Sequence, residues 1–92
     1  MAEWSVEFSS KSEDDLAVLD RQVRRRIIDR IKWFSENFDN LDPLPLGGEW
    51  RGFFKLRVGD WRIIYTLNTK KEIILIQYID RRDQIYKKKK SY

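Results

Sequence analysis

The clearest pattern in the chain is a pair of apolar-rich segments joined by Gly59-Asp60. Residues 53–58 and 61–67 carry apolar side chains at alternate positions, which is the period of a strand with one buried face. Glycine at the first of two loop positions suits a type II′ turn, because it accepts a positive φ without a Cβ clash. The sequence therefore predicts a β-hairpin in which Val58 pairs with Trp61 and Arg57 with Arg62.

The two faces of this predicted hairpin differ in chemistry. The side chains expected to face the core are Phe54, Leu56, Val58, Trp61, Ile63 and Tyr65. The opposite face carries Lys55, Arg57 and Arg62 beside Ile64. Like charges directly opposite each other destabilise a sheet, so a solvated outer face is an incomplete explanation for the Arg57–Arg62 pair. The sequence favours an anion-binding surface here, with the solvated face as the alternative.

The segment before the hairpin predicts one strand and two helices. Residues 4–8 alternate between apolar and polar side chains, which is typical of a half-buried strand. Three acidic residues follow Ser12, so Ser12 is expected to cap a first helix from Glu13 to about Leu19. A second helix is predicted by an apolar stripe with spacings of three and four, formed by Val23, Ile27, Ile31, Phe34 and Phe38.

Basic residues lie off the apolar stripe of this second helix. They are either a solvated helix face or a set of phosphate contacts, which carry no sequence information themselves. These residues are Arg24, Arg25, Arg26, Arg30 and Lys32.

The rest of the chain predicts loops and one long strand. Residues 37–48 contain both prolines and a Gly-Gly pair and are expected to form a loop. Trp50 either packs near the hairpin or stacks on a base. A turn is predicted over residues 68–71, and the isoleucine-rich segment Glu72–Ile79 predicts a strand buried on both faces.

The order of these elements, β-α-α-β-β-β, predicts an α+β fold. An N-terminal strand is followed by an αα-hairpin and a three-stranded antiparallel meander. The helices are expected to cover one face of the sheet, which leaves the cations on the other face.

Composition narrows the possible chemistry. A chain of 92 residues forms one small domain. It contains no cysteine and no histidine, so thiolate chemistry, a histidine base and the commonest metal ligand are excluded, and neither a metal nor a cofactor is expected. A net charge of +4 indicates an anionic partner. No apolar run has membrane length and no apolar leader begins the chain, so we expect a cytoplasmic protein without membrane contact.

The hairpin sequence LRVGDWRIIY, from Leu56 to Tyr65, resembles the central hairpin of the RelE/ParE superfamily of bacterial and archaeal toxins. The segment from Pro45 to Gly52 and the C-terminal run from Arg81 to Tyr86 extend the resemblance. Asp80 stands where relatives often carry a histidine. The resemblance implies the element order given above, with a single toxin domain over residues 1–86 and a basic tail over residues 87–92.

For RelE-like members the resemblance implies an mRNA interferase that acts without a metal. The ribose 2′-hydroxyl attacks the adjacent phosphorus, leaving a 2′,3′-cyclic phosphate and a 5′-hydroxyl. The catalytic residues that it implies are Lys55, Arg62, Arg81 and Tyr86, with Arg82 as the alternative to Arg81. Guanidinium groups stabilise the developing negative charge, and Lys55 is a possible base because neighbouring cations favour its neutral form. Tyr86 either contacts the RNA or packs as an ordinary aromatic residue.

A second group of cations is expected to hold RNA or the ribosome. Other relatives carry a further lysine two places before Lys55, where this chain has Phe53. This departure either weakens proton transfer or moves that role to Arg51 or Arg57. The terminal lysines are either an exposed tail or an electrostatic attachment to ribosomal RNA. The expected contacts are Arg51, Arg57, Arg82, Lys87, Lys88, Lys89 and Lys90.

Three functions remain open at this stage. The first is a toxin that enters the 30S A site of the ribosome, cuts mRNA there and is neutralised by a RelB-like antitoxin. The second is a ParE-like toxin that inhibits DNA gyrase without cutting RNA, since a fold does not fix a function. The third is a basic domain that only binds RNA or antitoxin. Lys55 with Arg62 favours the first function, whereas Phe53 and Asp80 keep the second open.

Overall fold

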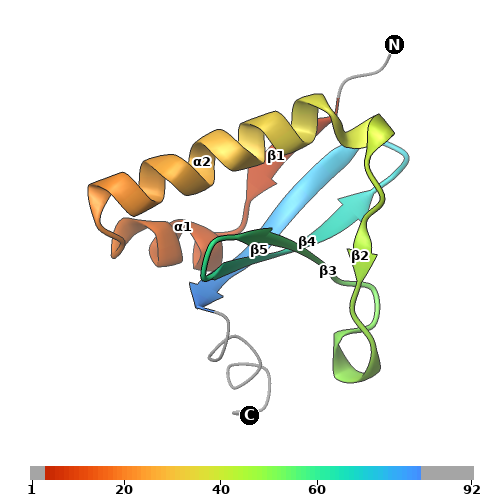
Figure 1. Ribbon diagram of the computed structural model, residues 1–92. Coiled ribbons are helices and arrows are strands. Elements are labelled where there is room, and N and C mark those ends of the chain that lie inside the picture. Colours follow the sequence, from red (N-terminus) through yellow and green to blue (C-terminus); the bar gives the residue numbers. More distant parts are fainter. Residues whose placement is uncertain (1–3, 82–92) are drawn as a thin grey trace.

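The computed structural model describes residues 4–81 and shows two helices on one face of a five-stranded sheet (Figure 1). The strand order is β1-β5-β4-β3-β2, with β1 parallel to β5 and the other pairs antiparallel. This arrangement confirms the predicted α+β fold. The elements are β1 (Ser5–Phe8), α1 (Ser10–Ala17), α2 (Arg21–Glu36), η1 (Phe38–Asn40), β2 (Leu44–Pro45), η2 (Gly48–Trp50), β3 (Phe54–Val58), β4 (Trp61–Asn68) and β5 (Ile73–Arg81).

The β3–β4 hairpin has the register that its turn predicted. All five cross-strand pairs are as expected, from Val58 with Trp61 to Phe54 with Tyr65. Gly59 has a φ of +59°. This is the left-handed conformation that the first position of a type II′ turn requires and that a side chain would strain.

The first helix begins earlier than predicted, and its cap is Ser9 instead of Ser12. The Ser9 hydroxyl oxygen accepts a hydrogen bond from the Ser12 backbone N–H at 3.0 Å. The Ser9 backbone N–H and hydroxyl also donate to the carbonyl oxygens of Ile76 and Gln77 on β5, each at 2.9 Å. Both serines are good caps in isolation, and the contacts with β5 decide between them. The helix ends at Ala17, two residues before the predicted end.

The second helix is close to its prediction. The Asp20 carboxylate caps it by accepting from the Gln22 backbone N–H at 3.2 Å. The last residue of the predicted apolar stripe, Phe38, lies beyond the helix in η1 but still belongs to the core. No helix within residues 4–81 is long and apolar enough to cross a bilayer.

The segment predicted to be only a loop contains a short edge strand, β2. Leu44 pairs with Lys55 and Pro45 with Phe54, and the Leu46 backbone N–H donates to the Phe53 carbonyl at 2.9 Å. Proline is tolerated at this position because an edge strand has a side that needs no backbone donor.

The sheet separates a large core from a smaller one. On the helix side, α1 and α2 pack against β4 and β5 through Leu16, Ile27, Ile31, Phe34, Phe38, Ile63, Tyr65, Ile74, Ile76 and Ile79. On the outer side, Trp50 and Ile64 form a second cluster with Leu46, Phe53 and Tyr78. The outer face of the sheet is therefore partly covered by the segment that precedes β3.

Helix α1 also supplies a hydrogen-bond acceptor to the edge of β5, at a position where β1 no longer pairs with that strand. Asp15 is buried, and its Oδ2 accepts from the Ile79 backbone N–H at 3.0 Å while its Oδ1 lies 2.6 Å from the Lys11 amine. A buried backbone donor without an acceptor is costly, so this carboxylate joins α1 to the sheet.

We expect Asp15→Ala to lower the free energy of unfolding by about 1–3 kcal/mol, because the Ile79 N–H loses its acceptor inside the protein. Lys11→Ala is the matched control. Its side chain is 49% exposed, so the effect should stay within about 0.5 kcal/mol. Urea denaturation measures both. Equal losses would show that the surface ion pair, and not the bond to β5, carries the effect.

Tyr65 is buried in the centre of the helix-side core, and its hydroxyl oxygen has no hydrogen-bond partner among the described residues. Burial raises the pKa of this phenol above its ordinary value of about 10. The unfolded chain therefore ionises before the folded protein does, and the stability from this group falls as the pH rises above 10.

We expect Tyr65→Phe to leave the free energy of unfolding unchanged near neutral pH or to raise it by up to about 1 kcal/mol, because an unsatisfied buried hydroxyl is removed. Between about pH 8 and about pH 11 the variant should lose less stability than the wild type, since it lacks the group that ionises on unfolding. Urea denaturation at both pH values tests this. Parallel losses in the two proteins would contradict it.

Candidate functional site

The outer face of the sheet brings three of the predicted cations together. The pairing places Arg57 of β3, Arg62 of β4 and Asp80 of β5 in one row across the sheet. The neighbouring row is formed by Lys55, Ile64 and Tyr78. Adjacent strands lie about 4.8 Å apart, so each row spans roughly 10 Å between its outer members. The three cations Lys55, Arg57 and Arg62 therefore occupy neighbouring positions on two adjacent strands.

Arg62 lies in the middle of this surface and is only 4% exposed. Asp80 stands directly across the ladder from it and is half-buried. The sequence showed the repulsive Arg57–Arg62 pair, but the opposing carboxylate on the other side of Arg62 became visible only through the β4–β5 register. Burial beside a carboxylate restricts the guanidinium to a narrow range of positions.

Lys55 and Arg57 are the accessible cations of the same face. Lys55 is half-buried and Arg57 is exposed. Neither forms an ion pair with a carboxylate in the part of the chain that the structure describes. Their positive charges are therefore not neutralised within this region.

A β-bulge in β5 decides which C-terminal residue faces Arg62. Ile64 pairs with Tyr78, but the next residue, Tyr65, pairs with Ile76, so Gln77 is the extra residue. A bulge shifts the alternation of side chains by one position. The Gln77 side-chain amide donates to the Thr66 hydroxyl oxygen at 3.1 Å, and the Gln77 backbone carbonyl accepts from the Ser9 hydroxyl at 2.9 Å. Without the bulge, Arg81 would share the face of Arg62.

Arg81 therefore lies apart from the cations of the outer face. It pairs with Trp61, whose side chain packs against the helix-side core. The Arg81 guanidinium carbon lies 5.9 Å from the centre of the Trp61 ring, within the range of a cation–π contact. The sheet thus places Lys55, Arg57 and Arg62 together and Arg81 on the opposite face.

The remaining predicted residues are more scattered. Arg51 is exposed in the loop before β3. The other predicted contacts lie outside the described residues, namely Arg82, Tyr86, Lys87, Lys88, Lys89 and Lys90. Within residues 4–81 no group of three or more acidic side chains is placed to hold a metal ion.

Tyr78 belongs to the candidate site, although sequence reasoning missed it. It lies in the same row as Lys55, and its ring packs edge-on to Trp50 with centroids 5.7 Å apart. Trp50 is 5% exposed and also contacts Phe53 edge-on at 5.4 Å, which confirms packing as its role. In the sequence, Tyr78 looks like one more residue of an apolar strand, and only the pairing with Ile64 reveals its position.

Comparison with known families adds a match that covers most of the chain. A profile of the family described as "ParE toxin of type II toxin-antitoxin system, parDE" matches residues 6–86. No sequence among the curated proteins searched matches the chain.

Solved structures show the same fold at low sequence identity. A chain of the RelBE2 toxin–antitoxin complex from Mycobacterium tuberculosis is 22% identical, with a TM-score of 0.78 over 88% of this chain and 100% of that one. A chain of the archaeal RelE–RelB complex from Pyrococcus horikoshii is 21% identical, with a TM-score of 0.68 over 88% and 97%. A mutant of the Escherichia coli toxin RelE in the free state is 13% identical, with a TM-score of 0.74 over 98% and 93%.

We expect Arg62→Ala to lower the free energy of unfolding by about 1–3 kcal/mol, because Asp80 loses the cation across the ladder. The exposed Arg57→Ala should change it by no more than about 0.5 kcal/mol, since a like-charge neighbour is removed. Chemical denaturation compares the two variants. A larger loss for Arg57→Ala would contradict the assignment of Arg62 as the structural member of this row.

Proposed function

Because the chain belongs to the ParE toxin family of type II toxin–antitoxin systems, within the RelE/ParE superfamily, we propose that it is a ribosome-dependent mRNA endoribonuclease. It would enter the 30S A site in the cytoplasm and cut the codon held there. The observation that carries this proposal is the gathering of Lys55, Arg57 and Arg62 on one face of the sheet.

The proposed reaction needs charge stabilisation more than a metal or a histidine. The 2′-oxygen loses its proton to a base and attacks the adjacent phosphorus, and the bond from phosphorus to the 5′-oxygen breaks as that oxygen takes up a proton from water. The products are a 2′,3′-cyclic phosphate and a 5′-hydroxyl. Fixed guanidinium groups stabilise the negative charge on the phosphorane oxygens, with paired donors toward them.

Within this reaction the cations of the outer face have different roles. Arg62, held by burial, would orient the phosphate, and the exposed Arg57 would bind a phosphate oxygen. Lys55 would accept the proton of the 2′-hydroxyl, because arginine stays protonated. Arg81 would have to leave Trp61 to take part, so its place in the mechanism is weaker than the resemblance implied. Arg82 and Tyr86 are retained as proposed contributors from the C-terminal segment.

We also propose a RelB-like antitoxin as the partner that neutralises the toxin. Two of the similar solved structures are toxin–antitoxin complexes, from M. tuberculosis and from P. horikoshii. An antitoxin that covers the cations of the outer face would prevent RNA from reaching them.

A ParE-like inhibitor of DNA gyrase is the second candidate, and Phe53 favours it. The resemblance gives other relatives of the RelE type a lysine at this position, whereas Phe53 packs here in the cluster of Trp50 and Ile64. The family profile that matches is also that of a ParE toxin. Gyrase inhibition would require no proton transfer at Lys55.

The test is to express the chain alone in growing cells and to map mRNA 5′ ends during translation. We expect new ends inside open reading frames, each with a 5′-hydroxyl. Lys55→Ala should lower the cleavage rate on programmed ribosomes by about 10²- to 10⁴-fold, because the base is removed. Intact messages together with inhibited DNA supercoiling would support the gyrase alternative instead.

Arg25→Ala provides the matched control for loss of one positive charge. Arg25 is an exposed residue of α2. It lies on the helix side of the sheet, whereas Lys55 belongs to the outer face. The substitution should leave cleavage within about two-fold of the wild type, as expected for an exposed charge outside the site. A similar loss in both variants would show that total charge, and not the position of Lys55, sets the rate.

A further inference from the structure

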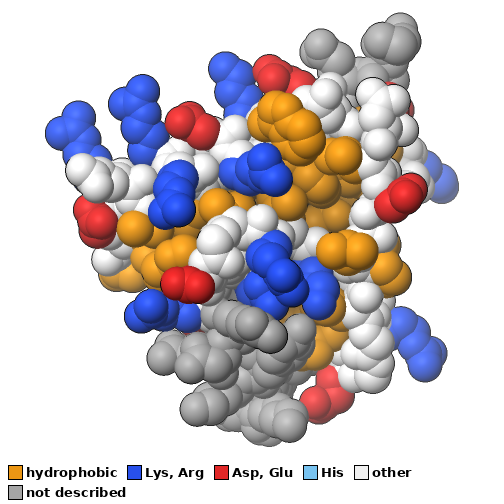
Figure 2. All heavy atoms as spheres, viewed as in Figure 1, with side chains coloured by type: hydrophobic (Ala, Val, Ile, Leu, Met, Phe, Trp, Pro, Cys, Tyr) orange, Lys and Arg blue, Asp and Glu red, His pale blue; other side chains and the backbone are white. Residues whose placement is uncertain are grey.

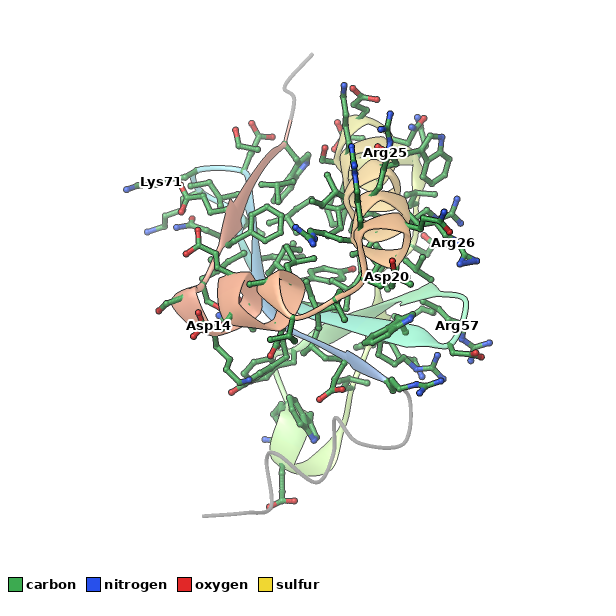
Figure 3. All side chains as sticks on the ribbon, turned by 90° about the vertical axis from the view of Figure 1, so that its left-hand side faces the viewer. Asp14, Asp20, Arg25, Arg26, Arg57 and Lys71 are labelled. Atoms are coloured by element: carbon green, nitrogen blue, oxygen red, sulfur yellow. The ribbon has the colours of Figure 1, made fainter. Side chains whose placement is uncertain are left out.

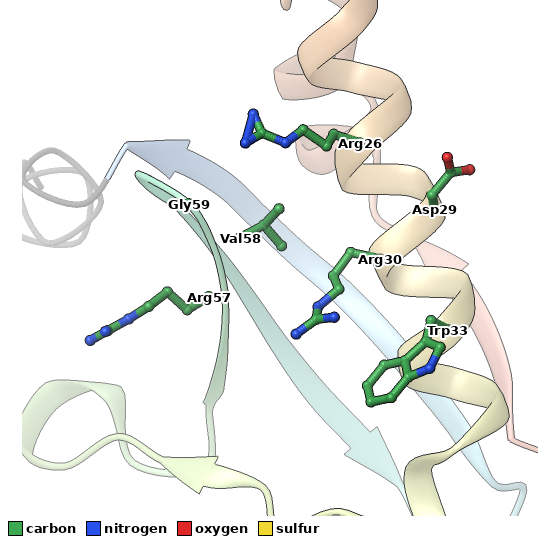
Figure 4. Close-up of a pocket in the computed structure, with 7 residues that line it drawn as sticks. All are labelled: Arg26, Asp29, Arg30, Trp33, Arg57, Val58 and Gly59. Atoms are coloured by element: carbon green, nitrogen blue, oxygen red, sulfur yellow. The ribbon is translucent and has the colours of Figure 1, made fainter.

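A second basic surface lies on the helix side of the sheet, between α2 and the turn of the β3–β4 hairpin (Figure 4). It is an open groove of about 450 Å³. We call it the α2–hairpin groove. Its lining consists of Arg26, Asp29, Arg30, Trp33, Arg57, Val58 and Gly59. Figure 2 shows basic side chains along α2 and over the hairpin, with apolar side chains between them.

Three residues of α2 form one stripe along this groove. Arg26, Arg30 and Trp33 are spaced by four and three residues, so they lie on the same side of the helix. Arg26 and Arg30 are therefore separated by about 6 Å along the helix axis. Two cations and one aromatic ring follow each other along the groove.

Trp33 is unusual for its size because it is 44% exposed. The Arg30 guanidinium carbon lies 4.9 Å from the ring centre, within the range of a cation–π contact. An exposed indole is a platform on which another flat ring can stack.

The positive charge in the groove is not neutralised by the acid that lines it. Asp29 points away from the hairpin (Figure 4), and its carboxylate lies 4.0 Å from Arg25. The guanidinium of Arg26 lies close to the turn, since its nearest nitrogen is 3.7 Å from where a Cβ on Gly59 would be. Arg26 and Arg57 project to the same side of the molecule (Figure 3).

We propose that the α2–hairpin groove binds one nucleotide, with its phosphate on Arg26 and Arg30 and its base stacked against Trp33. Guanidinium groups bind phosphate with paired donors, and every base has a face that can stack on an aromatic ring. Val58 is the only aliphatic side chain in the lining, where arginines outnumber acids. The apolar pocket beside the groove, lined in part by Phe34, Leu41 and Leu44, shares Arg30 and Trp33 with it.

The groove lies beside the candidate catalytic face across a single strand edge. Strand β2 covers the edge of β3 only at Phe54 and Lys55. The guanidinium of Arg57 points away from α2 (Figure 4), on the face that also carries Arg62. An RNA strand that crosses the edge of β3 at Arg57 would contact both surfaces. The inference that the nucleotide belongs to an RNA strand rests on the proposed function. The inference that the groove binds a phosphate and a base does not.

The test is fluorescence anisotropy with a labelled oligonucleotide of 2′-O-methyl RNA, which cannot be cut by attack of the 2′-oxygen. Trp33→Ala should weaken binding about 5- to 150-fold, which corresponds to about 1–3 kcal/mol of stacking per base. Trp33→Phe should restore part of the affinity, because it keeps a stacking ring. Thermal unfolding verifies that both variants fold.

Arg25→Ala and Arg30→Ala form the matched pair for charge. Each removes one arginine from α2, but only Arg30 lines the groove. Arg30→Ala should weaken binding more than Arg25→Ala. Equal losses for the two, or no loss for Trp33→Ala, would overturn the proposal.

Two further ligands identify the source of the nucleotide. The first is a nucleoside 5′-monophosphate. If it binds as tightly as the oligonucleotide and Trp33→Ala weakens this binding, the groove is assigned to free nucleotides. If the monophosphate binds weakly, the groove is assigned to an RNA strand. The second is a poly-glutamate peptide. If Trp33→Ala weakens binding of this peptide but not of RNA, the proposal is overturned in favour of an acidic protein as the ligand. If the wild-type protein cuts no RNA but binds the oligonucleotide in a manner that depends on Trp33, only the nuclease function is refuted.

Discussion

The burial of a charged side chain in the central strand is the constraint on which the rest of the site depends. Residues Arg62 to Tyr65 of β4 are all buried. Helices cover one face of the strand, and on the other face the Trp50 cluster covers Ile64. A guanidinium in such surroundings needs a counter-charge and has little freedom to move. Asp80 stands opposite on β5. The result is a cation whose position is set by the fold rather than by solvent.

The sheet also divides the basic residues between two surfaces. Lys55 and Arg57 belong to the outer face, whereas the cations of α2 lie on the helix side. The two surfaces approach each other along the edge of β3, where Arg30 of α2 lines one pocket together with Lys55 and Arg57. The proposed RNA strand would therefore have to cross this edge to contact both surfaces.

One inserted residue in β5 changes the chemistry of the outer face. The bulge at Gln77 turns Asp80 toward Arg62 and Arg81 toward Trp61. A regular strand would have placed Arg81 on the same face as Arg57 and Arg62, where the three like charges repel one another. The bulge thus replaces repulsion with attraction. It is supported by hydrogen bonds from Ser9 and to Thr66, which tie it to the start of α1 and to β4.

Local patterns in the sequence were enough for the hairpin register, the second helix and the gathering of Lys55, Arg57 and Arg62, because each depends on a short turn or a short period. The tertiary structure alone decided the cap at Ser9, the strand β2, the burial of Arg62 and the separation of Arg81 from it. These features depend on contacts between residues far apart in the chain. A period of two or 3.6 residues carries no information about a bulge or a partner strand, so the final arrangement of charges was set by β5.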